Sequence, residues 1–399
     1  MTPSHFETLI IGGGIGGLAT ALALAQTGRP VQLVEQASAF TEIGAGLQIG
    51  PNATRALDRL GLLDELSAVA VHPHSAIVRD ALTGEVLTAL DFGTAFRARY
   101  GYPYLVAHRS DVLSILLHAC EREPLVTLEN NRTVQTVADT ERGAVISFAD
   151  GDEYTADLVV GADGIKSRVR QLLDISEPVF SGHIAYRGAI DIDQVRTDIS
   201  TDDVVLWIGP GIHLMQYPVR RGELYNQVAV YESPRYAAGR DDWGHREEFD
   251  EMFTPACESV RNAVAQIDAS RAWPVFDRDP ISTWSTAHTV LIGDAAHAML
   301  QYLGQGACQA LEDALSLSRS LAAFPDDLTR AFKTYEGARV PITSKCQTVA
   351  RPWGRTWHTD DPALLALRNR VFRMRAADDY TDLDWLYAER PSDLGPLRT

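Results

Sequence analysis

The amino-acid sequence predicts an α/β fold in which a nucleotide-type parallel sheet is interrupted by an antiparallel lobe and followed by a C-terminal helical segment. Three observations lead to this prediction. The chain opens with a strand, a glycine turn, an alanine-rich helix and a second strand, written "LIIGGGIGGLATALALAQTGRPVQLVEQ". Residues 181–273 then alternate apolar and polar side chains, which is typical of antiparallel strands. A buried strand followed by an elbow of small residues returns at "HTVLIGDAAH".

The length of the chain predicts more than one structural unit. At 399 residues it exceeds what one hydrophobic core usually supports, so we expect several units that share one cleft. The patterns divide it into a nucleotide-binding domain in three parts, an inserted lobe in two parts and the helical segment. In that order, these are residues 1–72, 101–178 and 276–345; residues 73–100 and 179–275; and residues 346–399.

Local periodicity predicts each element in turn. We expect Ser110 to cap one helix and Pro341 to kink or end another. The predicted elements are a strand at 7–11, a helix at 15–27, a strand at 31–35, a helix at 51–66, a hairpin at 71–92, a helix at 108–122, strands within 126–160 and 181–273, a strand reaching residue 294, and helices from residue 307 onward.

Composition argues against several classes of function. A formal net charge of −17 makes nucleic acid and anionic membrane surfaces poor partners, because both require a basic face. The four cysteines have neither CxxC nor metal-ligand spacing, so we expect reduced thiols in a cytoplasmic protein and no metal site. The N-terminus lacks a signal-peptide pattern, and no apolar run approaches the roughly 18 residues of a transmembrane segment.

The glycine turn near the N-terminus predicts a dinucleotide site, for NAD or for FAD. Gly12, Gly14 and Gly17 have G-x-G-x-x-G spacing between a strand and a helix. Gly12 would allow the tight turn, Gly14 would let the backbone approach a pyrophosphate, and Gly17 would let the helix pack closely on the strand. Glu35, at the end of the next strand, would accept hydrogen bonds from ribose hydroxyls. The predicted contact residues are Gly12, Gly14, Ile15, Gly17, Glu35 and Gln36.

Two later motifs, taken with the glycine turn, resemble those of a known family. They are "GADGIKSRVR", which contains Asp163, and "GDAAHAMLQYLGQGACQALEDA", which contains Asp294. With "AHRSDVL" around Arg109, they have the order and spacing of the single-component FAD-dependent aromatic hydroxylases, the group A flavoprotein monooxygenases. The resemblance covers nearly the whole chain. It implies a Rossmann-like FAD-binding domain with an inserted antiparallel substrate lobe, and FAD, NADH and O2 as reactants.

The resemblance also implies roles for residues near the flavin. Asp294, after a parallel strand, would accept hydrogen bonds from the ribityl hydroxyls, and a helix N-cap is its alternative role. Arg109 would lie near the ribityl and phosphate portion. The segment "GQG" precedes a helix, and there Gly304, Gly306 and Ala307 would present backbone N–H groups to the N1/C2 edge of the isoalloxazine.

Three polar residues each keep two interpretations. Asp163 would either buttress its own loop or lie beside the pyrophosphate. Arg187, in "AYRG", would pair either with a substrate carboxylate or with a structural partner. His297 lies in the third motif, and the resemblance implies packing beside the pyrophosphate region in preference to a role as catalytic base.

The inserted lobe supplies the candidate catalytic residues. In the strand "IHLMQYPV", His213, Met215 and Tyr217 alternate onto one face, which the resemblance turns toward the flavin. A histidine suits the proton transfer that activates a phenol. Tyr217 would orient substrate or oxygen, or simply pack. At Gln301 many members of the family have proline, so the glutamine adds a donor and an acceptor beside the flavin.

The resemblance implies a small aromatic acid as substrate. NADH would reduce FAD, O2 would form a C4a-hydroperoxyflavin, and 3-hydroxybenzoate would be hydroxylated para to its phenol, giving 2,5-dihydroxybenzoate. A decarboxylating hydroxylase of the salicylate or 6-hydroxynicotinate type is the nearest alternative. An NAD-dependent dehydrogenase and a non-catalytic FAD-binding scaffold are the alternatives from other classes. The family also implies a homodimer, and the aromatic tail from Trp353 onward would pack on the core or at an interface.

Overall fold

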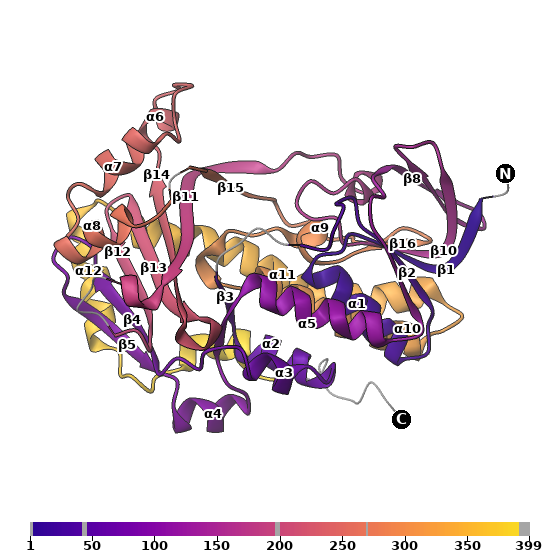
Figure 1. Ribbon diagram of the computed structural model, residues 1–399, viewed down its shortest axis with the longest axis horizontal. Coiled ribbons are helices and arrows are strands. Elements are labelled where there is room, and N and C mark those ends of the chain that lie inside the picture. The colour runs from indigo at the N-terminus through magenta and orange to yellow at the C-terminus, as the bar shows by residue number, and fades with distance from the viewer. Residues whose placement is uncertain (1–2, 42–45, 196–199, 269, 391–399) are drawn as a thin grey trace.

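The computed structural model describes residues 3–41, 46–195, 200–268 and 270–390. Two sheets lie toward opposite ends of an elongated molecule, with helices running between them (Figure 1). One sheet contains the strands of the nucleotide-type domain, and the other contains the strands of the inserted lobe. The predicted α/β class with an antiparallel lobe is therefore confirmed. The end of the predicted C-terminal segment, residues 391–399, lies outside the described residues.

Seven strands form the nucleotide-type sheet: β1 (Ser4–Ile11), β2 (Val31–Val34), β7 (Val126–Glu129), β8 (Val134–Thr140), β9 (Gly143–Phe148), β10 (Glu153–Gly161) and β16 (Thr289–Leu291). Their order is β7-β2-β1-β10-β9-β8, and β16 also pairs with β10. The first residues of β10 pair antiparallel with β9, and its last residues pair parallel with β16. Because β1 and β16 both run parallel to β10, the loops that follow β1, β10 and β16 meet at one edge.

The lobe sheet also has seven strands: β4 (Ser75–Asp80), β5 (Val86–Asp91), β11 (Val179–Asp191), β12 (Val204–Gly209), β13 (Ile212–Val219), β14 (Leu224–Glu232) and β15 (Trp273–Asp277). Their order is β15-β11-β14-β13-β12-β4-β5, in which β12 and β4 pair parallel and the other neighbours pair antiparallel. A ribbon of β3 (Gly46–Ile49) and β6 (Leu105–His108) lies between the sheets. The early hairpin β4–β5 thus extends a sheet built by a much later segment.

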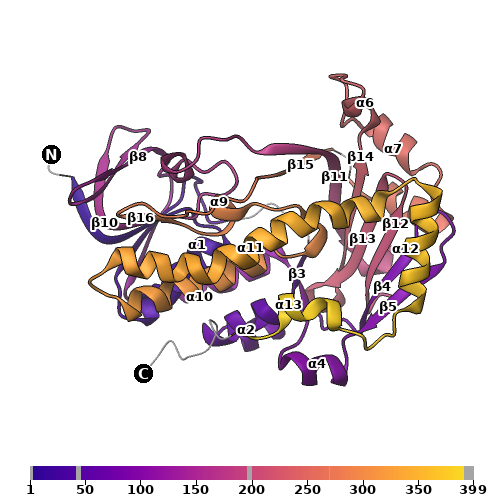
Figure 2. The same cartoon turned by 180° about the vertical axis from the view of Figure 1, so that it is seen from behind.

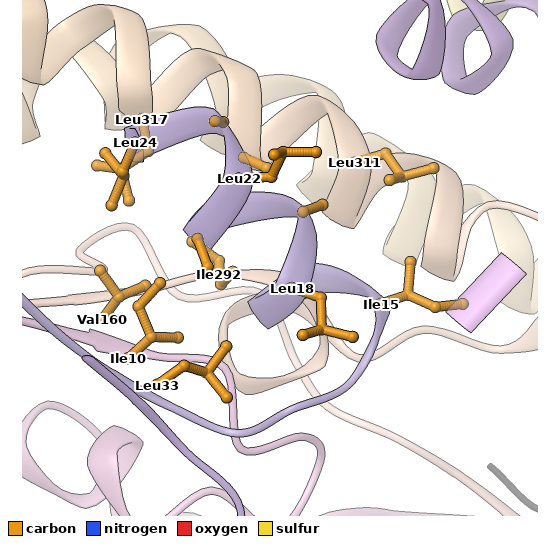
Figure 3. Packing of buried hydrophobic residues seen from close by; sticks show 14 of the residues in the cluster. Ile10, Ile15, Leu18, Leu22, Leu24, Leu33, Val160, Ile292, Leu311 and Leu317 are labelled. Carbon is orange, nitrogen blue, oxygen red and sulfur yellow. The ribbon is translucent and has the colours of Figure 1, made fainter. Parts of the chain in front are cut away.

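The helices are α1 (Ile15–Gln26), α2 (Pro51–Arg59), α3 (Leu63–Ser67), α4 (Thr94–Tyr100), α5 (Arg109–Arg122), α6 (Pro234–Ala237), α7 (Arg246–Phe253), α8 (Glu258–Ala265), α9 (Gly293–His297), α10 (Gly306–Ala323), α11 (Leu328–His358), α12 (Pro362–Met374) and α13 (Asp384–Tyr387). Helix α1 packs against α10 and α5. Leu18 and Leu22 of α1 lie in one buried cluster with Ile10, Ile292 and Leu311 (Figure 3).

Helix α11 connects the two ends of the molecule. It runs alongside α10 and continues to the lobe sheet, where α12 follows it (Figure 2). Its last two residues, Trp357 and His358, are buried against that sheet. The helix crosses residue 345, where a boundary between units was expected, so the proposed division of the chain separates one continuous helix.

Several local predictions were wrong at single residues. Of the two outcomes expected at Pro341, a kink or the end of a helix, the second is excluded, because α11 continues through it. The predicted helix at 51–66 is two helices, because Gly61 adopts φ +77° between them. Ser110 is not the N-cap of α5: the His108 side chain accepts the Ser110 N–H instead. The strand predicted to reach residue 294 ends at Leu291.

Candidate active site

Three cavities run end to end from the glycine turn to the lobe sheet. The turn cavity has a volume of about 920 Å³, the middle cavity about 160 Å³ and the sheet cavity about 270 Å³. Gly14 lines both the turn cavity and the middle cavity. Arg109, Asp294 and Gly306 line both the middle cavity and the sheet cavity. The shared walls make one extended path suited to a long ligand.

The glycine turn has the geometry expected of a phosphate cradle. Gly12 adopts φ +112°, and a Cβ there would clash with the Ala162 carbonyl. A Cβ on Gly17 would clash with the Gly12 carbonyl, so helix α1 approaches the strand as closely as predicted. A Cβ on Gly14 would meet no protein atom within 4 Å, so the backbone there is open to the cavities. Ile15, which begins α1, lines the middle cavity.

Glu35 and Gln36 lie at the far end of the turn cavity. The Glu35 carboxylate accepts hydrogen bonds from the backbone N–H of Gly13 at 2.7 Å and of Ala37 at 2.9 Å. These two bonds hold the carboxylate still against the glycine turn. Each carboxylate oxygen has a second lone pair, so Glu35 can still accept from a ligand hydroxyl.

Asp163 buttresses its own loop. Its carboxylate accepts from Ser167 Oγ at 2.5 Å and from the backbone N–H of Arg168 at 2.7 Å. Burial raises the pKa of Asp163, and these hydrogen bonds oppose that rise. The residue also lines the turn cavity, so the buttress role and the place beside a phosphate are compatible.

Asp294 presents an exposed carboxylate to the middle and sheet cavities. It lies in the first turn of α9, whose N-cap is Ile292, so the alternative role as a cap is excluded. Arg109, at the start of α5, lines the same two cavities. The Asp294 carboxylate and the Arg109 guanidinium thus both line the junction of the middle and sheet cavities. There the carboxylate could accept from ligand hydroxyls and the guanidinium could donate to ligand phosphates.

The N-terminus of α10 lies at the sheet cavity. The helix begins at Gly306, one residue before the predicted start, and has no side-chain cap. Gly304 adopts φ +62°, and Gly304, Gly306 and Ala307 all line the cavity. The side-chain oxygen of Gln305 instead accepts from Asn52 Nδ2 at 3.0 Å and Gln309 Nε2 at 2.8 Å. These bonds fix the loop so that its backbone faces the cavity.

The structure brings the three predicted catalytic residues together. His213 and Tyr217 share one face of β13 and line the sheet cavity, and Gln301 lines it from the short 3-10 turn before α10. Burial raises the pKa of Tyr217. Arg187 lines the same cavity, and its guanidinium stacks 3.9 Å from the centre of the Trp273 ring. The candidate site is therefore a polar pocket between the lobe sheet and the α10 N-terminus.

His213 has a buried partner that sequence analysis missed. Its Nδ1 lies 2.7 Å from Nε2 of His358, the last residue of α11. His358 Nδ1 lies 3.3 Å from Glu232 Oε1, and His183 Nε2 lies 3.2 Å from the same oxygen. The three elements are distant in sequence, and no local spacing links them. Among the described residues, ligand atoms of His183, Glu232 and His358 form the one group close enough to hold a metal ion, lying within 4.8 Å of one another.

The electrostatics of this group follow from its burial. Desolvation, together with the nearby His358 and His183, holds the pKa of His213 well below its ordinary value. Burial also lowers the pKa of His358, although Glu232 opposes that effect. Hydrogen bonds from His183 and His358 lower the pKa of Glu232 to about 2. Near neutral pH, His213 and His358 are therefore neutral and Glu232 is ionised.

His297 lies in a separate buried cluster. Its Nε2 donates to Asp313 Oδ2 at 2.6 Å, and Arg339 Nε donates to Asp313 Oδ1 at 2.7 Å. Asp313 also accepts the Gly293 N–H at 2.9 Å, which anchors the loop that carries Asp294. Since His297 does not line any of the three cavities, its surroundings agree with the packing role.

Comparison with known proteins identifies the family. A model of the FAD binding domain family matches residues 5–349. The chain belongs to this family. FAD is its cofactor. The three connected cavities, with an open backbone at Gly14 and an exposed carboxylate at Asp294, form one extended space that fits a dinucleotide such as FAD. The alternative of an NAD-dependent dehydrogenase is thereby dropped.

Several similar curated proteins are named as hydroxylases or monooxygenases of aromatic acids. The chain is 37% identical to 3-hydroxybenzoate 6-hydroxylase of Klebsiella oxytoca, over 96% of each chain. It is 35% identical to 3-hydroxybenzoate 6-hydroxylase of Polaromonas naphthalenivorans, again over 96% of each. It is 33% identical to 6-hydroxynicotinate 3-monooxygenase of Bordetella bronchiseptica, over 88% of this chain and 93% of that one. The chain is a flavin-dependent aromatic hydroxylase of the group A type.

Solved structures share the fold. HpxO of Klebsiella pneumoniae, in complex with FAD and uric acid, matches with a TM-score of 0.83 at 23% identity, over 94% of this chain and 95% of that chain. A salicylate hydroxylase substrate complex matches with a TM-score of 0.77 at 26% identity, over 97% and 95%. None of the helices in the described part of this chain has the length and apolar character needed to cross a membrane.

Proposed function

We propose that this enzyme uses FAD, NADH and O2 to hydroxylate 3-hydroxybenzoate para to its phenol group, giving 2,5-dihydroxybenzoate (gentisate). The observation that carries the proposal is the sheet cavity, where His213, Tyr217 and Gln301 meet beside Asp294 and the α10 N-terminus. Two relatives named 3-hydroxybenzoate 6-hydroxylase, at 37% and 35% identity, support the choice of substrate.

His213 is the proposed base for the phenol. A phenol becomes a strong nucleophile only when its proton leaves or is held in a strong hydrogen bond. The low pKa of the buried His213 keeps its ring neutral near pH 7, so the ring can accept a proton. Because Nδ1 contacts His358, Nε2 is the nitrogen left for the phenol. Gln301 provides a second polar partner for the phenol oxygen, and the two contacts would orient the ring with its para carbon toward the flavin.

The charge of the cavity suits an aromatic acid. Arg109 and Arg187 both line the cavity and both act to lower the pKa of Tyr217, against the larger effect of burial. Two guanidinium groups near one small pocket favour a carboxylate there, whatever the net charge of the whole molecule. Tyr217 packs its ring against Gly46, where a Cβ would clash with it, and lines the same cavity as both arginines.

Bound FAD would supply activated oxygen after NADH reduces it. The protein's part would be to hold the cofactor in place. Asp294 would bind the ribityl chain, Arg109 would lie near the first phosphate, and the α10 N–H groups would face the isoalloxazine edge. The full set of proposed cofactor contacts is Gly12, Gly14, Ile15, Gly17, Glu35, Gln36, Arg109, Asp163, Asp294, Gly304, Gly306 and Ala307.

A substrate panel tests the proposal. The purified yellow protein is mixed with NADH and with 3-hydroxybenzoate, salicylate or 4-hydroxybenzoate, and oxygen uptake, product and CO2 are measured. We expect 3-hydroxybenzoate to stimulate NADH oxidation and to yield 2,5-dihydroxybenzoate without CO2. Release of CO2 from salicylate at a higher kcat/KM would instead support the decarboxylating alternative. Absence of substrate-stimulated NADH oxidation with every compound would leave a non-catalytic FAD-binding protein.

Three further features belong to the same proposal. NADH is the proposed reductant, and a comparison of NADH with NADPH at equal concentration tests it. A homodimer in the cytoplasm is the proposed state, and sedimentation or light scattering of the FAD-loaded protein measures its mass.

The aromatic tail packs at least partly on its own chain, since Trp357 and Tyr387 are buried within the single chain.

A further inference from the structure

The wall between the sheet cavity and the surface contains two histidines in contact. His213 lines the sheet cavity and is 2% exposed. His358 lines a fourth cavity, of about 670 Å³, together with Glu232. The Glu232 side chain is 46% exposed, so it reaches solvent. The 2.7 Å contact between His213 Nδ1 and His358 Nε2 therefore joins the sheet cavity to the fourth cavity.

The carboxylate at the outer end determines which nitrogens carry protons. Glu232 is ionised, so the facing His358 Nδ1 carries a proton, since a bare nitrogen would repel the carboxylate. His358 Nε2 is then bare and accepts the Nδ1–H of His213. His213 Nε2 is bare in turn. The Glu232 carboxylate thus fixes the tautomers of His358 and His213. In the resulting tautomer, His213 Nε2 is unprotonated and can accept a proton from a ligand in the sheet cavity.

We propose that His358 and Glu232 form a proton relay that carries the phenol proton of the substrate from His213 to solvent. The phenol O–H bond breaks and a bond to His213 Nε2 forms. His213 Nδ1 releases its proton to His358 Nε2, and His358 Nδ1 releases its proton through Glu232 to water. No electrons are transferred, and a proton returning along the same path restores both rings. The relay rests on the proposed hydroxylation of a phenol.

The surroundings favour passage of the proton over storage. Arg368 lies near His358 and lowers its pKa, so a positive charge does not remain on that ring. The Tyr302 ring packs 5.5 Å from His213 and 5.9 Å from His358, which shields both rings from water. His183 contacts the same Glu232 oxygen as His358 but lies off the path. His358 and Glu232 are therefore positioning residues that act through His213.

The test measures proton release directly. A weakly buffered solution of the FAD-loaded enzyme with a pH-indicator dye is mixed with 3-hydroxybenzoate, and proton release and phenolate absorbance are followed by stopped flow. We expect His358→Ala and Glu232→Gln to slow proton release at least about tenfold, because each removes a step of a proton-transfer chain. The matched control is Leu364→Ala, which lines the same fourth cavity with an exposed apolar side chain and should keep the wild-type rate.

Chemical rescue separates the relay from a structural effect. The fourth cavity adjoins His358, so added imidazole can enter the space left in His358→Ala. We expect imidazole to restore proton release in proportion to the concentration of its neutral form, and to have no effect on wild type. Unchanged proton release in both His358→Ala and Glu232→Gln would overturn the relay. So would a loss in His358→Ala that imidazole does not restore while Glu232→Gln keeps the wild-type rate.

The relay and the proposed substrate fail in different ways. Suppose that 3-hydroxybenzoate is not hydroxylated but another phenol of the panel binds and releases its proton at a rate that depends on His358. The relay then stands and the substrate is wrong. If 3-hydroxybenzoate is hydroxylated and its proton leaves equally fast in every variant, the proposed function stands and the relay is overturned.

Discussion

Two clusters in this enzyme pair a histidine with a carboxylate, and their surroundings differ. In the inner cluster, the side chains of His297 and Asp313 are 0% exposed and Arg339 neutralises the acid. In the outer cluster, His213 faces a cavity and Glu232 faces solvent, with His358 between them. The inner cluster is buried throughout, whereas the outer cluster reaches the sheet cavity at His213 and solvent at Glu232.

The difference shows that connectivity, more than residue type, determines what a buried histidine can do. Within the described residues, neither His297 Nδ1 nor His358 Nδ1 makes a hydrogen bond of good geometry, but only His358 Nδ1 lies beside a solvent-exposed carboxylate, 3.3 Å from Glu232 Oε1. Asp313 instead ties α9 to α10 and α11 and fixes the loop that carries Asp294. His213 uses one nitrogen for His358 and keeps the other toward the cavity. The predictions below test this contrast, beginning with the largest effect.

His213→Ala should remove the base from the outer cluster. We expect the rate of hydroxylation to fall about 100-fold or more, because general-base catalysis contributes at least that much. NADH oxidation should continue, with H2O2 released in place of hydroxylated product. Product, NADH and H2O2 are measured in the same samples. The control is Met215→Leu, on the same face of β13 and in the same cavity, which should remain well coupled. Full hydroxylation in His213→Ala would reject the proposed base.

Asp313→Asn should break the inner cluster. Removing the charge leaves the buried Arg339 with Glu312 as its remaining carboxylate, 3.5 Å away, and breaking the shorter pair costs on the order of 3 kcal/mol of unfolding free energy. Urea unfolding of the FAD-loaded protein measures the loss, and flavin release should accompany it because Asp313 holds the Gly293 backbone. Asp326→Asn, at an exposed site, is the matched control. A loss no larger than in this control would contradict the structural role of Asp313.

Acid should affect the two carboxylates unequally. Burial opposes ionisation of Asp313, but His297 and Arg339 outweigh it and lower the pKa from 3.8 to about 2. A lowered folded-state pKa means stability that is present above pH ~4 and is lost as the pH falls toward 2. That loss is about 2 kcal/mol for Asp313. The pKa of Glu232 is also about 2, but its exposed side chain is screened, so its share is smaller.

The measurement for this third prediction is unfolding free energy as a function of pH. Wild type should lose stability between pH 4 and 2 relative to Asp313→Asn, whose amide does not titrate. Glu232→Gln should follow the wild-type curve closely. A larger change from Glu232→Gln than from Asp313→Asn would reverse the comparison.

Sequence analysis predicted what depends on neighbouring residues. The glycine turn, the start of α10 within one residue and the shared face of His213 and Tyr217 all follow from local spacing. The partner of His213 does not, because His358 and Glu232 lie on α11 and β14, far from β13 in sequence. Nothing near His358 marks it, since it ends a long helix among tryptophans. Only the packing of α11 on the lobe sheet reveals the pair.

The smaller errors arise mostly from local choices of conformation that the residue types leave open. The α5 N-cap depends on whether the His108 ring turns back on the Ser110 N–H, and serine is the commoner cap in general. The break between α2 and α3 depends on Gly61 taking a positive φ, which many helical glycines avoid. Pro341 remains inside α11, which packs against the neighbouring α10 along much of its length. Local conformation decided the first two cases, and only Pro341 involves packing between helices.

Gln301 gives the smallest predicted effect and the sharpest test of orientation. If it holds the phenol oxygen beside His213, then Gln301→Ala removes about one hydrogen bond, worth roughly 1 kcal/mol, and coupling should fall by about tenfold at most. Gln301→Pro is the matched variant. Leu300 has φ −64° and ψ 148°, which a following proline accepts, so the backbone should stay in place while the amide is lost. Both variants should raise H2O2 or shift hydroxylation away from the para carbon, as chromatography of the products would detect. If both keep the wild-type coupling and product, the phenol is oriented by His213 and the arginines, and Gln301 only packs.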